Sequence, residues 1–576
     1  MFADLTPNRS LREAIEEEKR RLGAQQTTHT APVIGDSAAE RVVAPMIPVE
    51  YQIQLACRPV TPEENAKMVV PVVDSDEESF LLHASLLAPD VELELMEDGH
   101  IPTDIVLIID ISGSMNNDAP PPKGKQVHES ANLSLSLLDL VKHATNTVIE
   151  TLTEYDRLAL VSFSNSAQIV FDFTVMTDVG KRLASSRLKS LEADGMTNLW
   201  DGLFKGLELL KARFDPQQPA LSAGLAQRNS TILLLTDGEP NIEPPRGILP
   251  MLKRYTERPE NKFQGVINTF GFGYSLHSHL LRDIAIQGNG MYAFIPDSGF
   301  VGTAFVNALA NTLSTVVTDA ELTVMPGEGV RIFPIDGLLH AVRPITLPAN
   351  SPKPLKTPVG TMQMGQSVDR MFYMTIKKNL LTSPNPNPSS LLASFTLNRA
   401  SARGVAFGSS QQTLLSQNIV SEYSQLSQSE DDVDKLQYQL VRYRATKTIQ
   451  AVYENMKMSK KEEAVNLVDS FVSEMNELTS GNLSYTLSQS QQRIKDLTRD
   501  FSGQISEAVS REEWWRKWGI HYLPSLQRAH ELQQCNNFKV CAFVCICICI
   551  CIIYFQCEYV IVCDTCIMYF LRVVNI

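Results

Sequence analysis

The sequence predicts an α/β fold with a doubly wound, mostly parallel sheet, flanked by β-rich segments and followed by a helical C-terminal region. Two observations support this prediction. Between residues 103 and 318, apolar runs of strand length alternate with amphipathic runs of helix length, as in a parallel sheet covered on both faces. On either side of that region, apolar and polar residues alternate with a period of two, and from residue 433 the period becomes helical.

The composition is that of a soluble globular protein, with 44% hydrophobic and 20% charged residues in a chain of 576. A net charge of -14 argues against a nucleic-acid partner, because the phosphate backbone would be repelled. The first residues lack the apolar core of a secretory signal, and only Cys57 and Cys535 precede residue 540. We therefore expect a cytoplasmic protein without disulfides.

The N-terminal segment, residues 1–45, is polar and is expected to be disordered. Residues 46–102 form a β-rich lead-in, since apolar residues alternate there, as in Val49, Tyr51 and Ile53. In residues 103–318 the expected strands include DIVLIID, DRLALVSF, TILLLTD and VINTFGFG, and the last expected helix is Phe300–Val317.

The pattern of apolar and polar residues changes twice in the second half of the chain. Residues 319–410 again alternate with a period of two and predict a second β-rich domain. A Ser/Gln-rich linker, residues 411–432, separates it from a helical region, residues 433–539. Because each β-rich block alone is short of strands, we hypothesise that the two blocks pair into one sandwich around the central region.

Five oxygen-bearing side chains follow predicted strands of the central region. Asp110, Ser112 and Ser114 lie in DISGS, Thr197 lies in GMTN, and Asp237 lies in LLLTDGEPN. Because the carboxyl ends of the strands in a doubly wound sheet converge on one crevice, we expect these side chains to meet. Hydroxyl and carboxylate oxygens suit a hard divalent cation, and this set leaves room for a carboxylate from outside. The sequence therefore predicts a metal site with an open position.

These residues, together with VSFSNSA and TFGFGY, resemble the von Willebrand factor type A domain and its metal-ion-dependent adhesion site, over about residues 103–318. The resemblance implies that Ser112, Ser114 and Thr197 coordinate Mg²⁺ or Mn²⁺, while Asp110 and Asp237 act directly or through water. It also implies that ligand binding is coupled to movement of the last helix.

A narrower resemblance extends to FGFGYSLHSHLL and WWRKWGIHYLPSLQRAHELQQCNNFK. These segments resemble intracellular proteins that join a type A domain to an intein-associated (Vwaint) domain. The match stops at Lys539, before any self-processing Hint domain. The matched residues therefore include none to which the self-processing cysteine chemistry of those relatives could be assigned.

Simpler interpretations compete with the metal site. The DxSxS motif is also typical of a helix N-cap, but a cap leaves Thr197 and Asp237 unexplained. Asp201 and Glu239 are candidate extra ligands, although solvated acids are the commoner case at such positions. His277 and His279 are interpreted as the start of a helix rather than as ligands.

Enzyme motifs are missing from the sequence. ISGSM does not form a G-x-S-x-G elbow, and neither a P-loop nor H-E-x-x-H occurs. Asp110 as a phosphoryl acceptor is disfavoured, because a hydroxyl-rich shell suits binding better. We therefore predict a non-enzymatic module that binds a protein partner through an Asp or Glu carboxylate. The alternatives are an enzyme, the remnant of a self-processing precursor, or a tail-anchored membrane scaffold.

The C-terminal end raises two further questions. Trp514, Trp515 and Trp518 form either an aromatic docking face or a core anchor, and the anchor is favoured. The tail, residues 540–576, holds eight of the ten cysteines, alternating with Ile. Its uncharged run is slightly shorter than the roughly 20 residues that span a bilayer. We interpret it as a nucleotide repeat read through as protein, and we expect membrane contact only if the tail is genuine.

Overall fold

The computed structural model describes residues 52–61, 73–88, 101–120, 135–212, 228–258, 265–335, 354–382, 391–400, 406–415, 430–480 and 488–534. All of them belong to one unit of mutually contacting residues that begins at Ile47. The predictions for residues 1–45, for most of the linker and for the Cys-rich tail lie outside the described residues. None of the helices in the described ranges is long and apolar enough to cross a membrane.

A six-stranded sheet forms the core of the central region, in the order β5-β4-β3-β6-β7-β8. All neighbouring strands run parallel except the edge pair β4 and β5, so the predicted doubly wound, mostly parallel sheet is confirmed. The middle strand, β3, is buried along its whole length, which its apolar sequence makes possible. The strands are β3 (Thr103–Asp110), β4 (Arg157–Phe163), β5 (Ala167–Val175), β6 (Asn229–Thr236), β7 (Val266–Phe272) and β8 (Asn289–Ile295).

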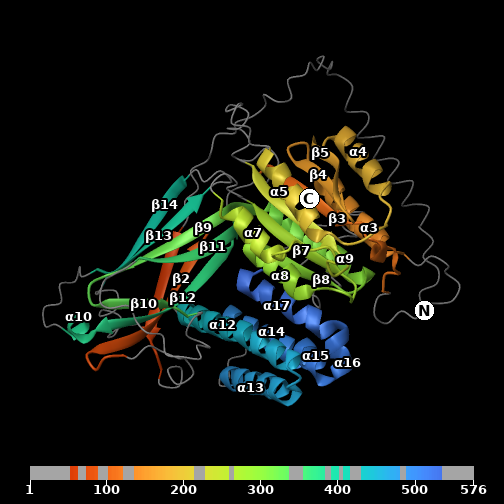
Figure 1. Ribbon diagram of the computed structural model, residues 1–576. Helices are drawn as coiled ribbons and strands as arrows, with labels where there is room; N and C mark the ends of the chain where they lie inside the picture. Colours follow the sequence, from red (N-terminus) through yellow and green to blue (C-terminus); the bar gives the residue numbers. More distant parts are fainter. Residues whose placement is uncertain are drawn as a thin grey trace, which may run out of the picture. The chain divides into compact units, whose positions relative to one another are not determined.

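Helices cover both faces of this sheet (Figure 1). One face packs against α3 (Leu137–Thr151), α4 (Asp178–Lys189) and α9 (Ser298–Leu313). The other packs against α5 (Leu199–Ala212), α7 (Ile248–Thr256) and α8 (Ser278–Gln287).

The predicted end of the last helix at Val317 is wrong. Helix α9 ends at Leu313, and a strand begins at Thr315. The β-branched residues of the TVVT run favour the extended strand over another helical turn.

The β-rich segments on either side of the central region form two four-stranded sheets, in the orders β1-β2-β12-β10 and β11-β9-β13-β14. Strand β2 pairs with β12 from Glu77 opposite Lys377 to Leu87 opposite Ser367. One apolar core draws residues from both sheets, including the Phe372 and Phe395 rings. The hypothesis that the two blocks pair with each other is therefore confirmed. The strands are β1 (Gln52–Pro59), β2 (Glu77–Leu87), β9 (Thr315–Pro326), β10 (Val330–Pro334), β11 (Leu355–Gln363), β12 (Ser367–Lys377), β13 (Leu391–Ala400) and β14 (Ala406–Leu415).

The C-terminal region is helical, as predicted, and packs on the face of the central sheet that carries α5, α7 and α8. Trp515 is buried in this shared core, and its ring lies 5.3 Å from the Tyr453 ring. Trp518 packs against the same core, so the core-anchor interpretation is confirmed for these two residues. The elements are α12 (Glu430–Lys457), α13 (Lys461–Ser480), α14 (Gln489–Asp500), a π-helix (Phe501–Ile505), α15 (Ser506–Ser510), α16 (Glu512–Trp514), a second π-helix (Trp515–Gly519) and α17 (Ile520–Leu532).

A buried network of hydrogen bonds attaches α17 to the central region. The Nδ1 atom of His521 lies 2.6 Å from the Ser278 hydroxyl, which also accepts a hydrogen bond of 2.9 Å from Tyr292. On the other side of the ring, Nε2 lies 3.1 Å from the Tyr274 carbonyl oxygen. Burial lowers the pKa of His521 to about 4, so the ring is neutral at physiological pH and Nε2 donates to the carbonyl.

Candidate metal and partner site at the carboxyl edge of the sheet

Two neighbouring parallel strands, β3 and β6, bring four of the five predicted ligands to one edge. Strand β3 ends at Asp110, and the following turn carries Ser112 and Ser114. Asp237 comes directly after β6, the neighbour of β3, and Thr197 lies just before α5. The side chains of Asp110, Ser112, Thr197 and Asp237 are buried, and Ser114 is half-buried. The convergence expected from the doubly wound topology is therefore present.

Hydrogen bonds connect four of these residues. The Ser112 backbone N–H donates to Asp110 Oδ1 over 2.8 Å, and the Ser112 and Ser114 hydroxyl oxygens lie 3.2 Å apart. The Ser114 hydroxyl donates to Asp237 Oδ1 over 2.9 Å. Thr197 faces the same space, because a Cβ atom added to Gly238 would lie 3.7 Å from Ser114 Oγ and 3.9 Å from Thr197 Oγ1. The structure brings all five predicted residues together.

Two further side chains position the cluster, and the sequence analysis did not find them. The Thr236 hydroxyl donates to Asp110 Oδ2 over 2.5 Å. The Asn241 side-chain oxygen accepts the Thr197 backbone N–H over 2.8 Å. The strand register explains the first contact, because Ile109 lies opposite Leu235 and the next residues along are Asp110 and Thr236. Only knowledge of that register could have predicted it.

The two carboxylates of the cluster repel each other in a buried environment. Burial raises the pKa of Asp110 above its ordinary value. Burial and then the charge of Asp110 raise the pKa of Asp237 to about 6, although the hydrogen bond from Ser114 lowers it in part. A divalent cation between them would relieve this repulsion, and hydroxyl and carboxylate oxygens are suitable ligands for Mg²⁺. The donor set therefore fits the implied metal.

The cluster depends on its hydroxyl groups. Across the described ranges, no group of three or more His, Cys, Asp or Glu residues comes together in a way that could hold a metal. Two carboxylates alone are a weak ligand set, because Mg²⁺ prefers an octahedron of oxygens and Ca²⁺ prefers six to eight oxygens. The three hydroxyls are what distinguishes this edge as a candidate.

The candidate extra ligands do not contact the five residues. Asp201 Oδ2 accepts the Ala167 backbone N–H over 2.6 Å, which attaches the loop after β4 to the first turn of α5. The expectation that Asp201 is solvated is therefore wrong, because this hydrogen bond holds its half-buried carboxylate. Glu239 is exposed, as expected.

The two histidines lie at the start of α8, as interpreted. The His277 ring accepts a hydrogen bond of 3.2 Å from the Leu280 backbone N–H and so caps the helix. The His279 ring packs edge-on against Tyr453, with 4.6 Å between the ring centres. Neither contact involves the five predicted ligands.

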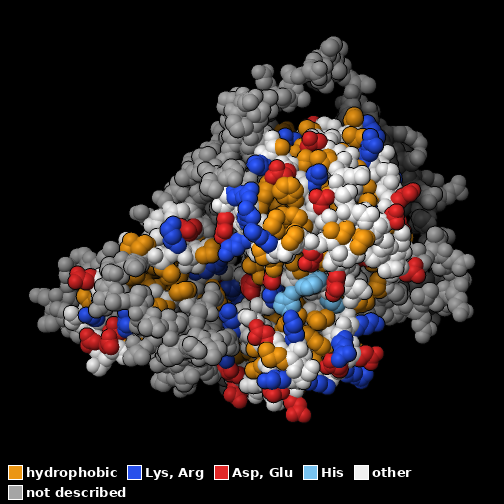
Figure 2. All heavy atoms as spheres, viewed as in Figure 1, with side chains coloured by type: hydrophobic (Ala, Val, Ile, Leu, Met, Phe, Trp, Pro, Cys, Tyr) orange, Lys and Arg blue, Asp and Glu red, His pale blue; other side chains and the backbone are white. Residues whose placement is uncertain are grey.

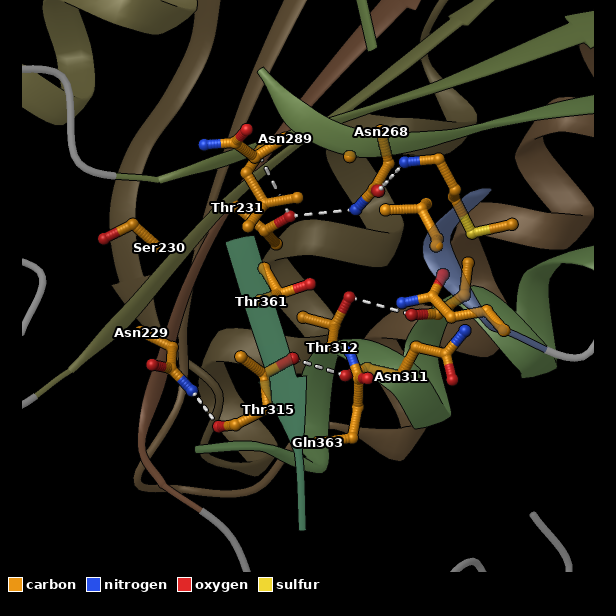
Figure 3. A pocket seen from close by; sticks show the side chains of 16 residues that line it. Asn229, Ser230, Thr231, Asn268, Asn289, Asn311, Thr312, Thr315, Thr361 and Gln363 are labelled. Atoms are coloured by element: carbon orange, nitrogen blue, oxygen red, sulfur yellow. Dashed lines mark hydrogen bonds between the residues drawn. The ribbon is translucent and has the colours of Figure 1, made fainter. Parts of the chain in front are cut away.

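A small polar cavity lies at the opposite edge of the sheet, at the amino ends of β6, β7 and β8 (Figure 3). Its volume of about 30 Å³ has room for roughly one or two water molecules. The lining groups bond mainly to one another: Asn229 donates to the Thr315 carbonyl over 2.6 Å, Asn268 donates to the Thr231 hydroxyl over 3.1 Å, and Thr315 donates to the Asn311 carbonyl over 2.6 Å. We interpret the cavity as part of the hydrogen-bonded packing between the sheet and the start of β9.

Residues 105–239, which include all five clustered side chains, match the family model for the von Willebrand factor type A domain. The chain contains a von Willebrand factor type A domain. Residues 491–544 match a second family model, described as VWA / Hh protein intein-like. The type A domain and the intein-associated segment therefore occur together in this chain, as the sequence resemblance implied, but the second match runs to residue 544 and does not stop at Lys539 as expected.

Among relatives, the chain is similar to inter-alpha-trypsin inhibitor heavy chain H3 of Mus musculus, with 30% identity over 224 residues. The alignment covers 38% of this chain and 22% of that protein. The chain thus spans about a fifth of the length of this relative, whose other regions have no counterpart in the alignment.

Two solved structures are also similar. A von Willebrand factor type A protein from Catenulispora acidiphila has a TM-score of 0.46 and 15% identity. The alignment covers 78% of this chain and 96% of that protein's chain. The ArnB paralog VWA2 from Sulfolobus acidocaldarius has a TM-score of 0.43 and 13% identity, and covers 80% of this chain and 98% of its own.

Proposed function

We propose that the type A domain holds Mg²⁺ or Mn²⁺ through Asp110, Ser112, Ser114, Thr197 and Asp237, and that a protein partner completes the coordination with an Asp or Glu carboxylate. One observation carries the proposal: two buried carboxylates and three hydroxyls meet at the carboxyl edge, linked by the 2.9 Å bond from Ser114 to Asp237. In this role the chain is a metal-dependent adhesion or scaffold module.

The ligand types explain why an outside carboxylate would be attracted. Ser112, Ser114 and Thr197 supply neutral oxygens, which bind a cation without cancelling its charge. Asp110 is already committed to the Ser112 N–H and to the Thr236 hydroxyl, so its charge is partly satisfied by the protein. When bound, the cation would supply Lewis acidity at the open side of the cluster. An anionic oxygen is the ligand best suited to that position.

A catalytic role has less support. The Ser112 and Ser114 hydroxyls lie against each other, and the Ser114 hydroxyl donates to Asp237, without an imidazole base in these contacts. Ser278 and His521 do form a serine–histidine contact, but both side chains are buried, and their hydrogen bonds are satisfied by Tyr292 and Tyr274. A substrate would have no access to this hydroxyl.

The experiment is a calorimetric titration of MgCl₂ into the full-length chain, followed by partner capture with magnesium or with a chelator. Asp110→Ala should abolish both the heat of magnesium binding and capture. The matched control, Asp178→Ala, removes an exposed acid from the first turn of α4 and should leave both unchanged. The proposal fails if magnesium uptake is absent, or if it is equal in the two variants.

Coupling to the last helix is part of the proposal. Helix α9 ends at Leu313 and leads within two residues into β9, so an axial shift of the helix would reach the sandwich. Spin labels on α9 and on β3 should report a changed distance after magnesium and partner are added. An unchanged distance distribution would rule this coupling out.

A further inference from the structure

Side chains of α17 bind the backbone along the outer edge of the central sheet. Strand β8 is the last strand of that sheet, and α17 packs along it (Figure 1). The Ser525 hydroxyl donates to the Tyr292 carbonyl over 3.1 Å, and Arg528 Nε donates to the Gly290 carbonyl over 2.9 Å. His521, one turn earlier on α17, binds the loop before α8. These side chains satisfy backbone groups that an edge strand otherwise exposes.

The hydrogen bonds of His521 need a neutral ring. Nε2 donates to the Tyr274 carbonyl, so Nδ1 accepts the proton of the Ser278 hydroxyl. A second proton on Nδ1 would meet that hydroxyl proton, and the same hydroxyl already accepts a bond from Tyr292. Within the described residues, neither nitrogen contacts a carboxylate that could balance a positive charge. Protonation of His521 therefore works against the contact between α17 and the type A domain.

A second buried histidine nitrogen lies between α8 and α12. The His279 ring packs edge-on against the Tyr453 ring, with 4.6 Å between their centres. Its Nε2 atom is buried and has no hydrogen-bond partner in the described part of the chain. A charged ring would place an N–H donor there without an acceptor, which is costly in a buried position. Protonation of His279 therefore works against the contact between α8 and α12.

Charged groups near His279 do not compensate a proton on its ring. The charges of Arg282 and Lys457 oppose it, and so does that of His277. Asp283 acts in the favourable direction, but its carboxylate binds Arg282 over 2.9 and 3.1 Å. Figure 2 shows His side chains over α8, among Lys, Arg, Asp and Glu side chains. Burial and then these cations lower the pKa of His279 to about 4.

Charged groups around His521 are engaged with other partners. The Lys517 ammonium lies 5.5 Å from the centre of the Tyr274 ring. Burial and then the charge of Asp297 raise the pKa of Tyr274. Glu531 pairs with an arginine of the same helix over 3.2 Å. Neither of these two acids contacts the His521 ring, and burial lowers the pKa of His521 to about 4.

We propose that protonation of His279 and His521 opens the contact between the C-terminal helices (α12 to α17) and the type A domain, so that acid frees the β8 edge and the outer face of α8. The two histidines lie at separate points of this one contact, and the closed contact requires both to be neutral. His530 takes no part, since its ring lies 3.9 Å from Asp500 inside the C-terminal helices. The inference does not depend on the proposed metal.

The expected size of the effect follows from proton linkage. In the open form each ring is exposed to water and regains its ordinary pKa of 6.5, whereas in the closed form the pKa is about 4. The closed form is therefore fully favoured above pH 6.5 and loses this advantage as the pH falls towards 4. Between pH 7 and pH 5, each histidine should raise the ratio of open to closed molecules by about 20-fold, and the pair by about 400-fold.

Hydrogen exchange followed by mass spectrometry tests the proposal on the full-length chain. An isolated helix of 13 residues, the length of α17, is marginal in water, so α17 should exchange once it detaches. After correction for the intrinsic effect of pH, the protection of Ile520–Leu532 should fall by about 400-fold between pH 7 and pH 5. Strand β13 of the sandwich serves as the reference and should lose much less protection.

Variants assign the effect to the two rings. His279→Phe keeps an aromatic ring beside Tyr453 but cannot bind a proton, and His521→Gln keeps a donor near the position of Nε2. Each should reduce the acid effect by about 20-fold, and the double variant should abolish it. The matched control, His143→Gln, removes an exposed histidine from α3 on the other face of the sheet and should leave the effect intact. If His521→Gln does not fold, His279→Phe alone should still reduce the effect by about 20-fold.

Three results would overturn the inference. If α17 keeps its full protection at pH 5, the contact is not sensitive to acid. If α17 and β13 lose protection equally, the whole chain unfolds and no local contact opens. If the acid effect is undiminished in the double variant, or in His279→Phe where only that variant folds, other groups cause it.

Discussion

Thr236 offers a sharp test of how the protein would prepare the proposed metal site. Its buried hydroxyl donates to Asp110 Oδ2 over 2.5 Å, while the other oxygen of that carboxylate accepts the Ser112 N–H. Thr236→Val replaces the hydroxyl by a methyl group of nearly the same size. The carboxylate would then be held from one side only. Groups that orient a metal ligand are typically worth about 10- to 100-fold in metal affinity.

We therefore expect Thr236→Val to weaken magnesium binding by about 10- to 100-fold, which corresponds to about 1.4 to 2.7 kcal/mol. Without magnesium, the loss of a donor to a buried carboxylate should lower the free energy of unfolding by about 1 to 3 kcal/mol. Thr236→Ser keeps the hydroxyl and should retain most of the affinity. Calorimetric titration with MgCl₂ measures the first effect, and urea unfolding with a chelator present measures the second.

Two results would refute this reasoning. If Thr236→Val keeps magnesium affinity within about twofold of the unaltered chain, the hydroxyl does not prepare the site. If Thr236→Ser loses as much affinity as Thr236→Val, then packing rather than the hydrogen bond matters. Either result would leave the ligand set untouched, since Thr236 is not among the five proposed ligands.

Three further predictions concern stability. Asp104 is buried and accepts hydrogen bonds from Arg157 over 2.6 and 2.8 Å. Asp104→Ala should therefore lower the free energy of unfolding in urea by about 3 to 5 kcal/mol. The control, Glu321→Ala, breaks an exposed pair with a lysine and should lower it by about 0 to 1 kcal/mol. His521 should contribute a fall in the free energy of unfolding as the pH drops from 6.5 towards 4, because it binds a proton more readily in the unfolded chain. This contribution is the difference between the pH profiles of the unaltered chain and of His521→Gln, since the raised pKa of Asp237 acts in the opposite direction in both. Phe501→Ala should cost about 3 to 5 kcal/mol, measured by thermal unfolding, because the buried ring loses its packing.

Much of the central region could be predicted because its signals are local. The run from Thr103 to Asp110 is buried on both faces, and a continuous apolar segment of that length is typical of a central parallel strand. The polar residues that directly follow such strands must meet at one edge, which made Asp237 a predictable partner of Asp110. Thr197 follows α4 rather than a strand, so topology alone does not place it beside them.

Other features depend on pairings that local patterns do not encode. A period of two predicts that β2 is a strand, but it does not predict that β12, far along the chain, is its neighbour. The contact from Thr236 to Asp110 depends on the register of β3 against β6. The end of α9 was misplaced because LSTVV fits a helix and a strand almost equally well until the β-branched residues decide it.

The way the type A domain is inserted between the two β-rich blocks is compatible with the binding proposed at its carboxyl edge. The chain enters the central sheet at Thr103, at the amino end of β3, and leaves it through α9 into β9 at Thr315. Asn229, at the amino end of β6, bonds to the Thr315 carbonyl, so the exit is attached to the same edge. Both connections to the sandwich therefore lie opposite the clustered ligands. Binding at the carboxyl edge would leave these connections intact, and any coupling between the two edges would have to pass along α9 or through the sheet.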